Sequence, residues 1–352
     1  MKTLSRARRI ETPRRQDAKT EKLLISELAS WRLGVFIFCA LVAGCGTASQ
    51  AVVTPARPVG EDLIALLPSG ADLLVDVDLE QFRGWAPARR FVDLLPEDAR
   101  ARFQRLGFDP LADADALVTA VAGLGTPEPQ TTTLVRGDVD VKAARASLGE
   151  PVSEADYHGT TIVEGPAGAL ARITPRVVAF GAPIDVRRVV DVAHSDSVSL
   201  RASPADRALL DAYARAPTAR LGRPAVIAAA LPTPILRERL RAEHLPGAEL
   251  EWLAMSLAVG DGFDVVMVFG ARGVPEAKAL AGSMRESLQK FMGTTAVRLL
   301  GLRQFLEPIV IKPRESEVRL AARMSEGIVS QMLERLESVH AMQKPRVEGK
   351  HE

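Results

Sequence analysis

The sequence predicts an α+β protein of two similar halves, each an antiparallel sheet with helices packed on one face. Segments of alternating apolar and polar residues, such as residues 72–79, are typical of strands and recur along the chain. Segments with helical spacing, such as residues 275–292, lie between them. Tight turns such as residues 260–262 join neighbouring strands as hairpins, and hairpins favour antiparallel sheets over the crossovers of a doubly wound nucleotide-binding fold.

The first half, residues 59–194, begins with the strand over 72–79. A helical pattern over 87–106 follows, and Pro96 divides it into two helices because proline cannot continue a helix. A helix over 139–148 ends at Gly149. The further expected elements of this half are strands over 115–124, 131–136, 160–164, 169–173 and 176–181, and a helix over 184–193.

The second half, residues 224–340, follows a linker at 195–223 that contains a helical pattern over 206–214. Thr233 is a suitable cap for the next helix, which begins with Pro234. The remaining expected elements are strands over 225–231, 252–259, 263–270, 307–311 and 317–322, and helices over 234–243, 275–292 and 325–339.

An internal duplication is predicted from the order of these elements. Residues 134–137, followed by a helix, match residues 267–270, which are also followed by a helix. Residues 176–181 match residues 318–322 in the same way. The alternative is that alternating strands and helices look alike in any α+β chain.

Composition excludes several classes of protein. The 352 residues carry 45 Lys+Arg and 44 Asp+Glu, whereas general nucleic-acid binders carry a strong basic excess. Two Cys exclude a disulfide scaffold and a Cys-rich metal module. Aromatic residues make up 5% of the chain, so stacking platforms for bases or sugars would be sparse.

The N-terminus has the layout of a secretory signal peptide. Residues 1–32 form a long polar region with 9 basic and 4 acidic residues. Residues 33–44 are mainly apolar, and this stretch is shorter than the roughly 20 residues that a membrane-spanning helix needs. A positive region, a short apolar region and small residues at its end are typical of a cleaved leader.

The end of that leader, Val42-Ala43-Gly44-Cys45, resembles the lipobox of bacterial lipoproteins. The resemblance implies transfer of a diacylglycerol to the Cys45 thiol, cleavage after Gly44 and acylation of the new amino terminus, with palmitate-type chains. Val42 departs from the commonest Leu at that position, although aliphatic residues there are acceptable. The alternatives are an uncleaved anchor, or a buried helix with an inert Cys.

Cleavage would leave 308 residues with 36 basic and 40 acidic residues, and Cys45 as the remaining thiol. Residues 45–58 are small, polar and Pro-containing, and are expected to tether the fold to the lipid. Residues 341–352 are expected to be a disordered, charged tail. In general layout alone, the body also resembles uncharacterised exported lipoproteins with duplicated α+β domains.

Motifs for catalysis are mostly absent from the sequence. It contains no Gly-x-Ser-x-Gly elbow, no phosphate loop and no His-Glu-x-x-His, and Gly260-Asp261-Gly262 lacks the third glycine of a dinucleotide fingerprint. Asp76 and Asp78 lie two residues apart on a strand, so both side chains point to one face. The pair would suit a functional carboxylate site. The alternative is that the two side chains only form a polar face of the strand.

The other polar clusters are expected to be structural. Asp109, Asp113 and Asp115 contain only fragments of a calcium loop. None of the five His lies at a metal-ligand spacing from another, and His194 is expected at the C-terminus of a helix. The sequence indicates no catalytic residue, no cofactor and no metal.

Two functions are consistent with these features of the sequence. The first is a membrane-anchored envelope lipoprotein without catalysis, held by lipid on Cys45 and facing the periplasm from the outer membrane. Its body would bind another envelope protein, a wall polymer or a lipid, and no nucleic acid. The alternative is an envelope hydrolase with an unrecognised carboxylate site near Asp76 and Asp78.

Overall fold

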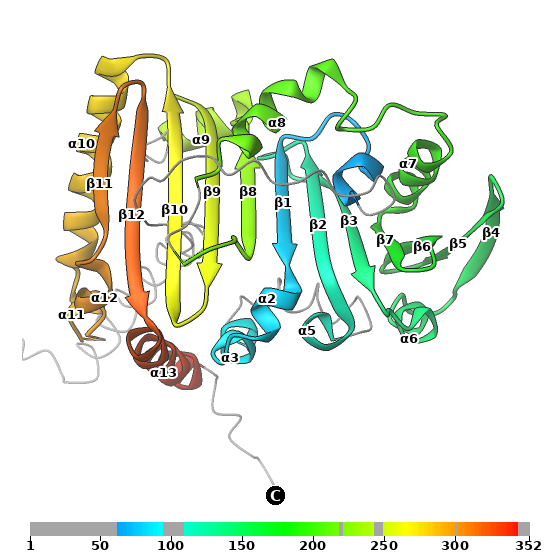
Figure 1. The fold of residues 1–352 in the computed structure, drawn as a ribbon, viewed down its shortest axis with the longest axis horizontal. Helices are drawn as coiled ribbons and strands as arrows, with labels where there is room; N and C mark the ends of the chain where they lie inside the picture. Colours follow the sequence, from blue (N-terminus) through cyan, green and yellow to red (C-terminus); the bar gives the residue numbers. More distant parts are fainter. Residues whose placement is uncertain (1–61, 94–108, 218–220, 243–248, 300, 344–352) are drawn as a thin grey trace, which may run out of the picture. The chain divides into compact units, whose positions relative to one another are not determined.

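The fold is known from a computed structural model, which describes residues 62–93, 109–217, 221–242, 249–299 and 301–343. These residues belong to one compact unit, Gly44–Glu352. They form a mixed α+β structure with one large antiparallel sheet (Figure 1).

Twelve strands of the described chain make up this sheet, in the order β11-β12-β10-β9-β8-β1-β2-β3-β7-β6-β5-β4 (Figure 1). The strands are β1 (Leu73–Asp78), β2 (Ala114–Ala122), β3 (Gln130–Gly137), β4 (Ser153–Tyr157), β5 (Thr160–Gly165), β6 (Gly168–Thr174), β7 (Val177–Gly181), β8 (Val226–Ala230), β9 (Leu250–Val259), β10 (Gly262–Ala271), β11 (Val310–Arg314) and β12 (Glu317–Ser325).

Helices cover the sheet or connect its strands. The α-helices are α2 (Leu79–Arg83), α3 (Ala88–Asp93), α5 (Pro110–Asp113), α6 (Val141–Ala146), α7 (Pro183–Ala193), α8 (Arg207–Ala214), α9 (Pro234–Ala242), α10 (Val274–Met292), α11 (Thr295–Leu299), α12 (Arg303–Leu306) and α13 (Glu326–Gln343). Two short 3-10 helices are η2 (Leu63–Leu66) and η3 (Pro204–Asp206).

The expectation of two separate sheets is wrong, because β1 and β8 pair directly. Leu73 lies opposite Ala230, and Val77 lies opposite Val226. This antiparallel pairing joins the strands of both predicted halves into one sheet. Outward from the joint, β1-β2-β3-β7-β6 on one side and β8-β9-β10-β12-β11 on the other follow the same order.

The register of the sheet corrects the proposed match of residues 134–137 with residues 267–270. Residues opposite each other across a ladder share a face. Through the intervening strands, Leu134 lies in the same row as Val266, whereas Met267 lies in the row of Val75, on the opposite face. A rotation within one sheet preserves faces, so Leu134 cannot superpose on Met267.

On the face of the sheet that carries Leu74 and Leu134, α7 covers strands of the first half, whereas α8 packs mainly on β8 and β9 and reaches β1 across the joint. Val189 of α7 and Leu209 of α8 are fully buried in the same apolar cluster as these two strand residues. The helix predicted inside the linker is therefore part of the core. In the second half α10 packs against β11, where Ile311 is buried and Lys312, on the other face, is exposed.

Several elements differ from the sequence prediction for local reasons. Leu79 begins α2 instead of ending β1, because the Asp78 side chain caps the helix. Strand β4 escaped prediction because its Ser153–Asp156 residues are all exposed and no apolar alternation marks it. The predicted strand over 307–311 begins later, at Val310. The second predicted helix, after Pro96, lies outside the described residues.

The hairpin between β9 and β10 gives a matched pair of substitutions. A Cβ on Gly262 would lie 2.4 Å from the carbonyl oxygen of Met324 on β12, whereas a Cβ on Gly260 would meet nothing within 4 Å. We expect Gly262→Ala to lower the free energy of unfolding by roughly 1–3 kcal/mol, as overpacked sites do. Gly260→Ala should change it by less than about 0.5 kcal/mol.

Urea unfolding of both variants measures the difference. Equal midpoints for Gly262→Ala and Gly260→Ala would contradict the close approach of β10 and β12.

Candidate functional site

The predicted lipidation site, Cys45, lies outside the described residues, as do the rest of the lipobox and the apolar stretch before it. Lipidation of Cys45 therefore stays a prediction. Within the described part of the chain, no helix is both long and apolar enough to cross a bilayer.

Asp76 and Asp78 point to one face of β1, as predicted, but each has its own structural partner. The Tyr213 hydroxyl on α8 donates a hydrogen bond to Asp76, at 2.7 Å between the oxygens. Asp78 accepts the backbone N–H of Gln81 at 3.2 Å and pairs with Arg223 at 2.9 Å. One carboxylate thus fixes a helix against the sheet, and the other caps a helix.

The acidic loop at the start of β2 is a set of caps and ion pairs. Asp109 accepts the Leu111 N–H at 3.0 Å, and Arg89 donates to its other oxygen. Burial acts to raise the pKa of Asp109, but these hydrogen bonds outweigh burial and lower it. Asp113 accepts the Asp109 N–H, and Asp115 pairs with Arg176. No three His, Cys, Asp or Glu side chains of the described residues are grouped as a metal site.

Two histidines that are far apart in sequence meet at the tip of the β4–β5 hairpin. The ring centroids of His158 and His194 are 5.7 Å apart, and His158 lies 3.8 Å from Asp191 and 3.5 Å from Asp196. The Tyr157 hydroxyl donates to Asp191, and this hydrogen bond raises the pKa of Tyr157. His194 caps the C-terminus of α7, as predicted. The cluster fastens the hairpin to that helix.

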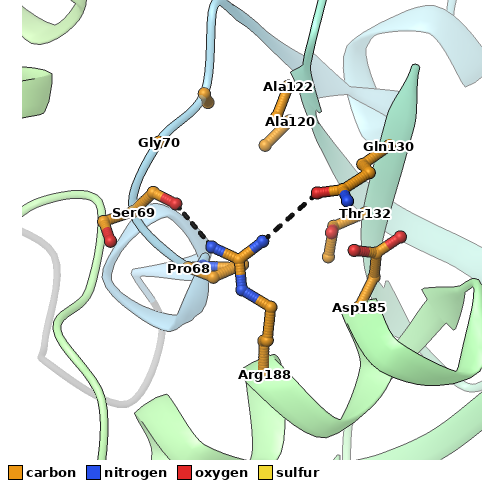
Figure 2. A pocket seen from close by; sticks show the side chains of 10 residues that line it. Pro68, Ser69, Gly70, Ala120, Ala122, Gln130, Thr132, Asp185 and Arg188 are labelled. Atoms are coloured by element: carbon orange, nitrogen blue, oxygen red, sulfur yellow. Dashed lines mark hydrogen bonds between the residues drawn. The ribbon is translucent and has the colours of Figure 1, made fainter. Parts of the chain in front are cut away.

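A small cavity lies where the N-terminal part of α7 meets the starts of β1 and β3. It is partly open to solvent and has a volume of about 10 Å³, which is room for about one water molecule. Figure 2 shows Asp185 and Arg188 both directed into it from α7. Its other polar or small lining residues include Ser69, Gly70, Ala122, Gln130 and Thr132.

Asp185 is the unusual residue of this cavity. Asp185 is only 1% exposed, and neither of its carboxylate oxygens has a hydrogen-bond partner. Asp185 is the third residue of α7, where a carboxylate can reach back to the N–H of the cap residue. The Ala182 N–H lies near enough to favour the charged form, but outside hydrogen-bonding geometry.

Burial raises the pKa of Asp185, because a charged carboxylate loses its hydration in the interior. The positive charge of Arg188 acts in the opposite direction but does not reverse the shift. Arg188 donates to the Ser69 carbonyl oxygen at 2.8 Å and to the Gln130 side chain at 3.5 Å (Figure 2). A carboxyl group and a guanidinium group therefore line one cavity without a hydrogen bond between them.

No motif in the sequence singles out Asp185. An acidic residue in the first turn of a helix is common, because the helix dipole stabilises negative charge near the N-terminus. The sequence Ala182-Pro183-Ile184-Asp185 therefore indicates only the start of a helix. The cavity forms because the Gly70 and Gln130 segments, distant in sequence, meet at that helix.

Comparisons with known proteins give fold-level likeness only. No protein-family model matches the sequence. No curated protein matches it either. Crystal form I of TP0453 is similar with a TM-score of 0.43 and 10% identity, over 82% of this chain and 98% of that chain. Crystal form III gives a TM-score of 0.45 and 11% identity, over 81% and 100%. Likeness this weak carries no argument about function.

The raised pKa of Asp185 makes a prediction about stability and pH. Because the folded chain holds this proton more tightly than the unfolded chain, the stabilisation is present at acid pH and is lost as the pH rises through the folded-state pKa. Asp185→Asn keeps the shape without ionising. At neutral pH we expect the free energy of unfolding of Asp185→Asn to be about 1–3 kcal/mol higher than that of the wild type.

This difference in the free energy of unfolding between Asp185→Asn and the wild type should shrink as the pH falls toward 3.8, the ordinary pKa of Asp. Urea unfolding over this range measures it, with Asp211→Asn, on the exposed side of α8, as the control. A gap that stays constant with pH would show that the ionisation of Asp185 does not affect folding.

Proposed function

We propose that this protein is a lipid-anchored lipoprotein of the bacterial envelope, whose α+β body binds a partner without catalysis. The single observation that carries the anchor is Val42-Ala43-Gly44-Cys45 at the end of a short apolar segment with a basic flank. One acyl chain holds a protein only marginally, whereas two or more hold it stably, so a triacylated Cys45 would be a firm anchor.

A binding role is supported by how the carboxylates of the body are used. Catalysis requires an acid, a base or a nucleophile placed against a group that stabilises the transition state. Asp76 and Asp78, the pair named as an alternative hydrolase site, each hold neighbouring elements in place instead. The partner classes consistent with an envelope location are another envelope protein, a wall polymer or a lipid.

We also infer that the two five-stranded groups descend from one duplicated unit. Their identical strand order supports this, as does the position of α6 and α10 after the third strand of each group. In an experimental structure, one rotation should place β1–β3 on β8–β10 with Leu134 on Val266 or Val268. A fit that requires swapped faces would argue against duplication.

The two cysteines of the chain allow a matched test of the anchor. Cys45→Ala removes the thiol that would accept the lipid, whereas Cys39→Ala changes a Cys inside the apolar segment and leaves the lipobox intact. We expect Cys45→Ala to leave an uncleaved precursor that no longer partitions into the detergent phase as the mature protein does. Cys39→Ala should behave like wild type.

Phase separation in detergent and mass spectrometry of the amino terminus measure both effects. Unchanged processing and partitioning of Cys45→Ala would refute the lipid anchor.

A further inference from the structure

We propose that a basic face of the sheet, formed by β11 and β12, docks on the anionic headgroups of a phospholipid bilayer. The basic face consists of the side chains of Lys312, Arg314, Arg319 and Arg323. The proposal rests on the envelope location proposed above, and it names the surface by which the anchored body contacts the membrane. Three observations support it: the shared orientation of these side chains, the lack of ion pairs at three of them, and the side of the body at which the tether begins.

The register of the sheet places the four basic residues on one face. Lys312 of β11 lies opposite Arg319 of β12. Arg314 follows Lys312 by two residues and Arg323 follows Arg319 by four, and alternate residues of a strand share a face. The helix that packs on β11 is α10, which lies on the other face, where Ile311 is buried. The basic face is therefore exposed at one edge of the sheet (Figure 1).

Three side chains of the basic face have no acidic partner among the described residues. Lys312, Arg314 and Arg323 are exposed, and none of them forms an ion pair with a described carboxylate. Elsewhere in the sheet and its connections, exposed arginines such as Arg187 and Arg223 do pair with carboxylates. The three charges are therefore available to anions outside the body.

The positive charge is local, because the body as a whole is slightly acidic. The predicted mature chain has 36 basic and 40 acidic residues. On the same face of β10 and β12, the acidic residues are Glu317, which is half-buried, and Asp264, which is fully buried. Like charges directly opposite each other, as Lys312 and Arg319 are, also destabilise a sheet. Anions at this surface would relieve that repulsion.

The tether favours a bilayer over an acidic protein as the partner. Leu63, at the start of the described chain, is buried in the apolar cluster on the face that carries Leu134. Val310, which lies between the basic side chains and is 40% exposed, belongs to the same row of the sheet as Leu134. Residues 45–61 can span at most about 60 Å. Lipid on Cys45 would therefore hold this side of the body near the headgroups.

Docking of this kind should be electrostatic. Each Lys or Arg near an anionic leaflet contributes roughly fivefold to binding. Salt shortens the reach of charge from about 8 Å at physiological ionic strength to about 3 Å at 1 M. Docking should therefore weaken in 1 M salt, whereas a contact made by apolar burial alone would not.

Fluorescence quenching in vesicles tests the proposal. The mature, lipidated chain carries a thiol-reactive fluorophore at Val310→Cys, on the basic face, or at Ser283→Cys, exposed on α10. The vesicles contain a lipid with a quencher on its headgroup, in phosphatidylcholine alone or in an equal mixture with phosphatidylglycerol. We expect the Val310→Cys label to be quenched more strongly in the anionic vesicles, and this difference to disappear at about 1 M salt. The Ser283→Cys label should be quenched weakly in both.

Charge reversal in the Val310→Cys background gives a matched comparison. Lys312→Glu should lower the ratio of docked to undocked protein at least about fivefold. Lys278→Glu makes the same change at an exposed residue of α10 and should leave the ratio unchanged. Equal quenching of the two labels, equal quenching in the two kinds of vesicle, or equal effects of the two reversals would overturn the proposal.

Failure of the anchor gives a different result. In the mature, lipidated chain the introduced Cys is the only thiol, because Cys39 leaves with the leader and Cys45 carries lipid. More than one label per chain, together with loss of the protein from neutral vesicles, would contradict the anchor. One label per chain without any preference for anionic vesicles would contradict the docking alone.

Discussion

The pairing of β1 with β8 is the interaction on which the rest of the sheet depends. Five residues of each strand, about 150 positions apart in the sequence, lie opposite each other from Leu73 and Ala230 to Val77 and Val226. Because β1 also pairs with β2, and β8 with β9, the register at this joint fixes which residues of the outer strands face each side. A slip of one residue here would move Leu74 from the buried face to the other.

The two edges of this sheet are protected in different ways. At β11, Pro313 removes a backbone donor, and Arg285 of α10 donates to the Ile311 carbonyl oxygen. At β4 the exposed residues include Glu154 and Asp156. Charged side chains on a short edge strand oppose pairing with another chain. A continuous sheet of this width therefore ends in one covered edge and one acidic edge.

Among the residues that the structure describes, the carboxylates named above differ in ways that only the tertiary structure reveals. Asp76, Asp78 and Asp109 each accept a hydrogen bond: the first joins α8 to β1, and the other two cap the helices that follow them. Asp185 is more buried than a typical carboxylate and has no donors. The first three carboxylates explain how the fold is held together. Asp185 instead lowers the stability of the fold when it is charged, because a buried charge without hydrogen-bond partners costs free energy.

The sequence by itself determined the α+β class, most strands and helices, the start of α9 capped by Thr233 and the place of His194, because these follow from local periodicity and capping. It also contains Val42-Ala43-Gly44-Cys45, a local pattern of adjacent residues whose resemblance to a lipobox stays a prediction. Only the tertiary structure decided that one sheet replaces two, that Leu134 and Met267 face opposite sides, and that Asp185 is buried without a partner. Each of these depends on strands that meet across long stretches of chain, and local sequence carries no record of which segments will meet.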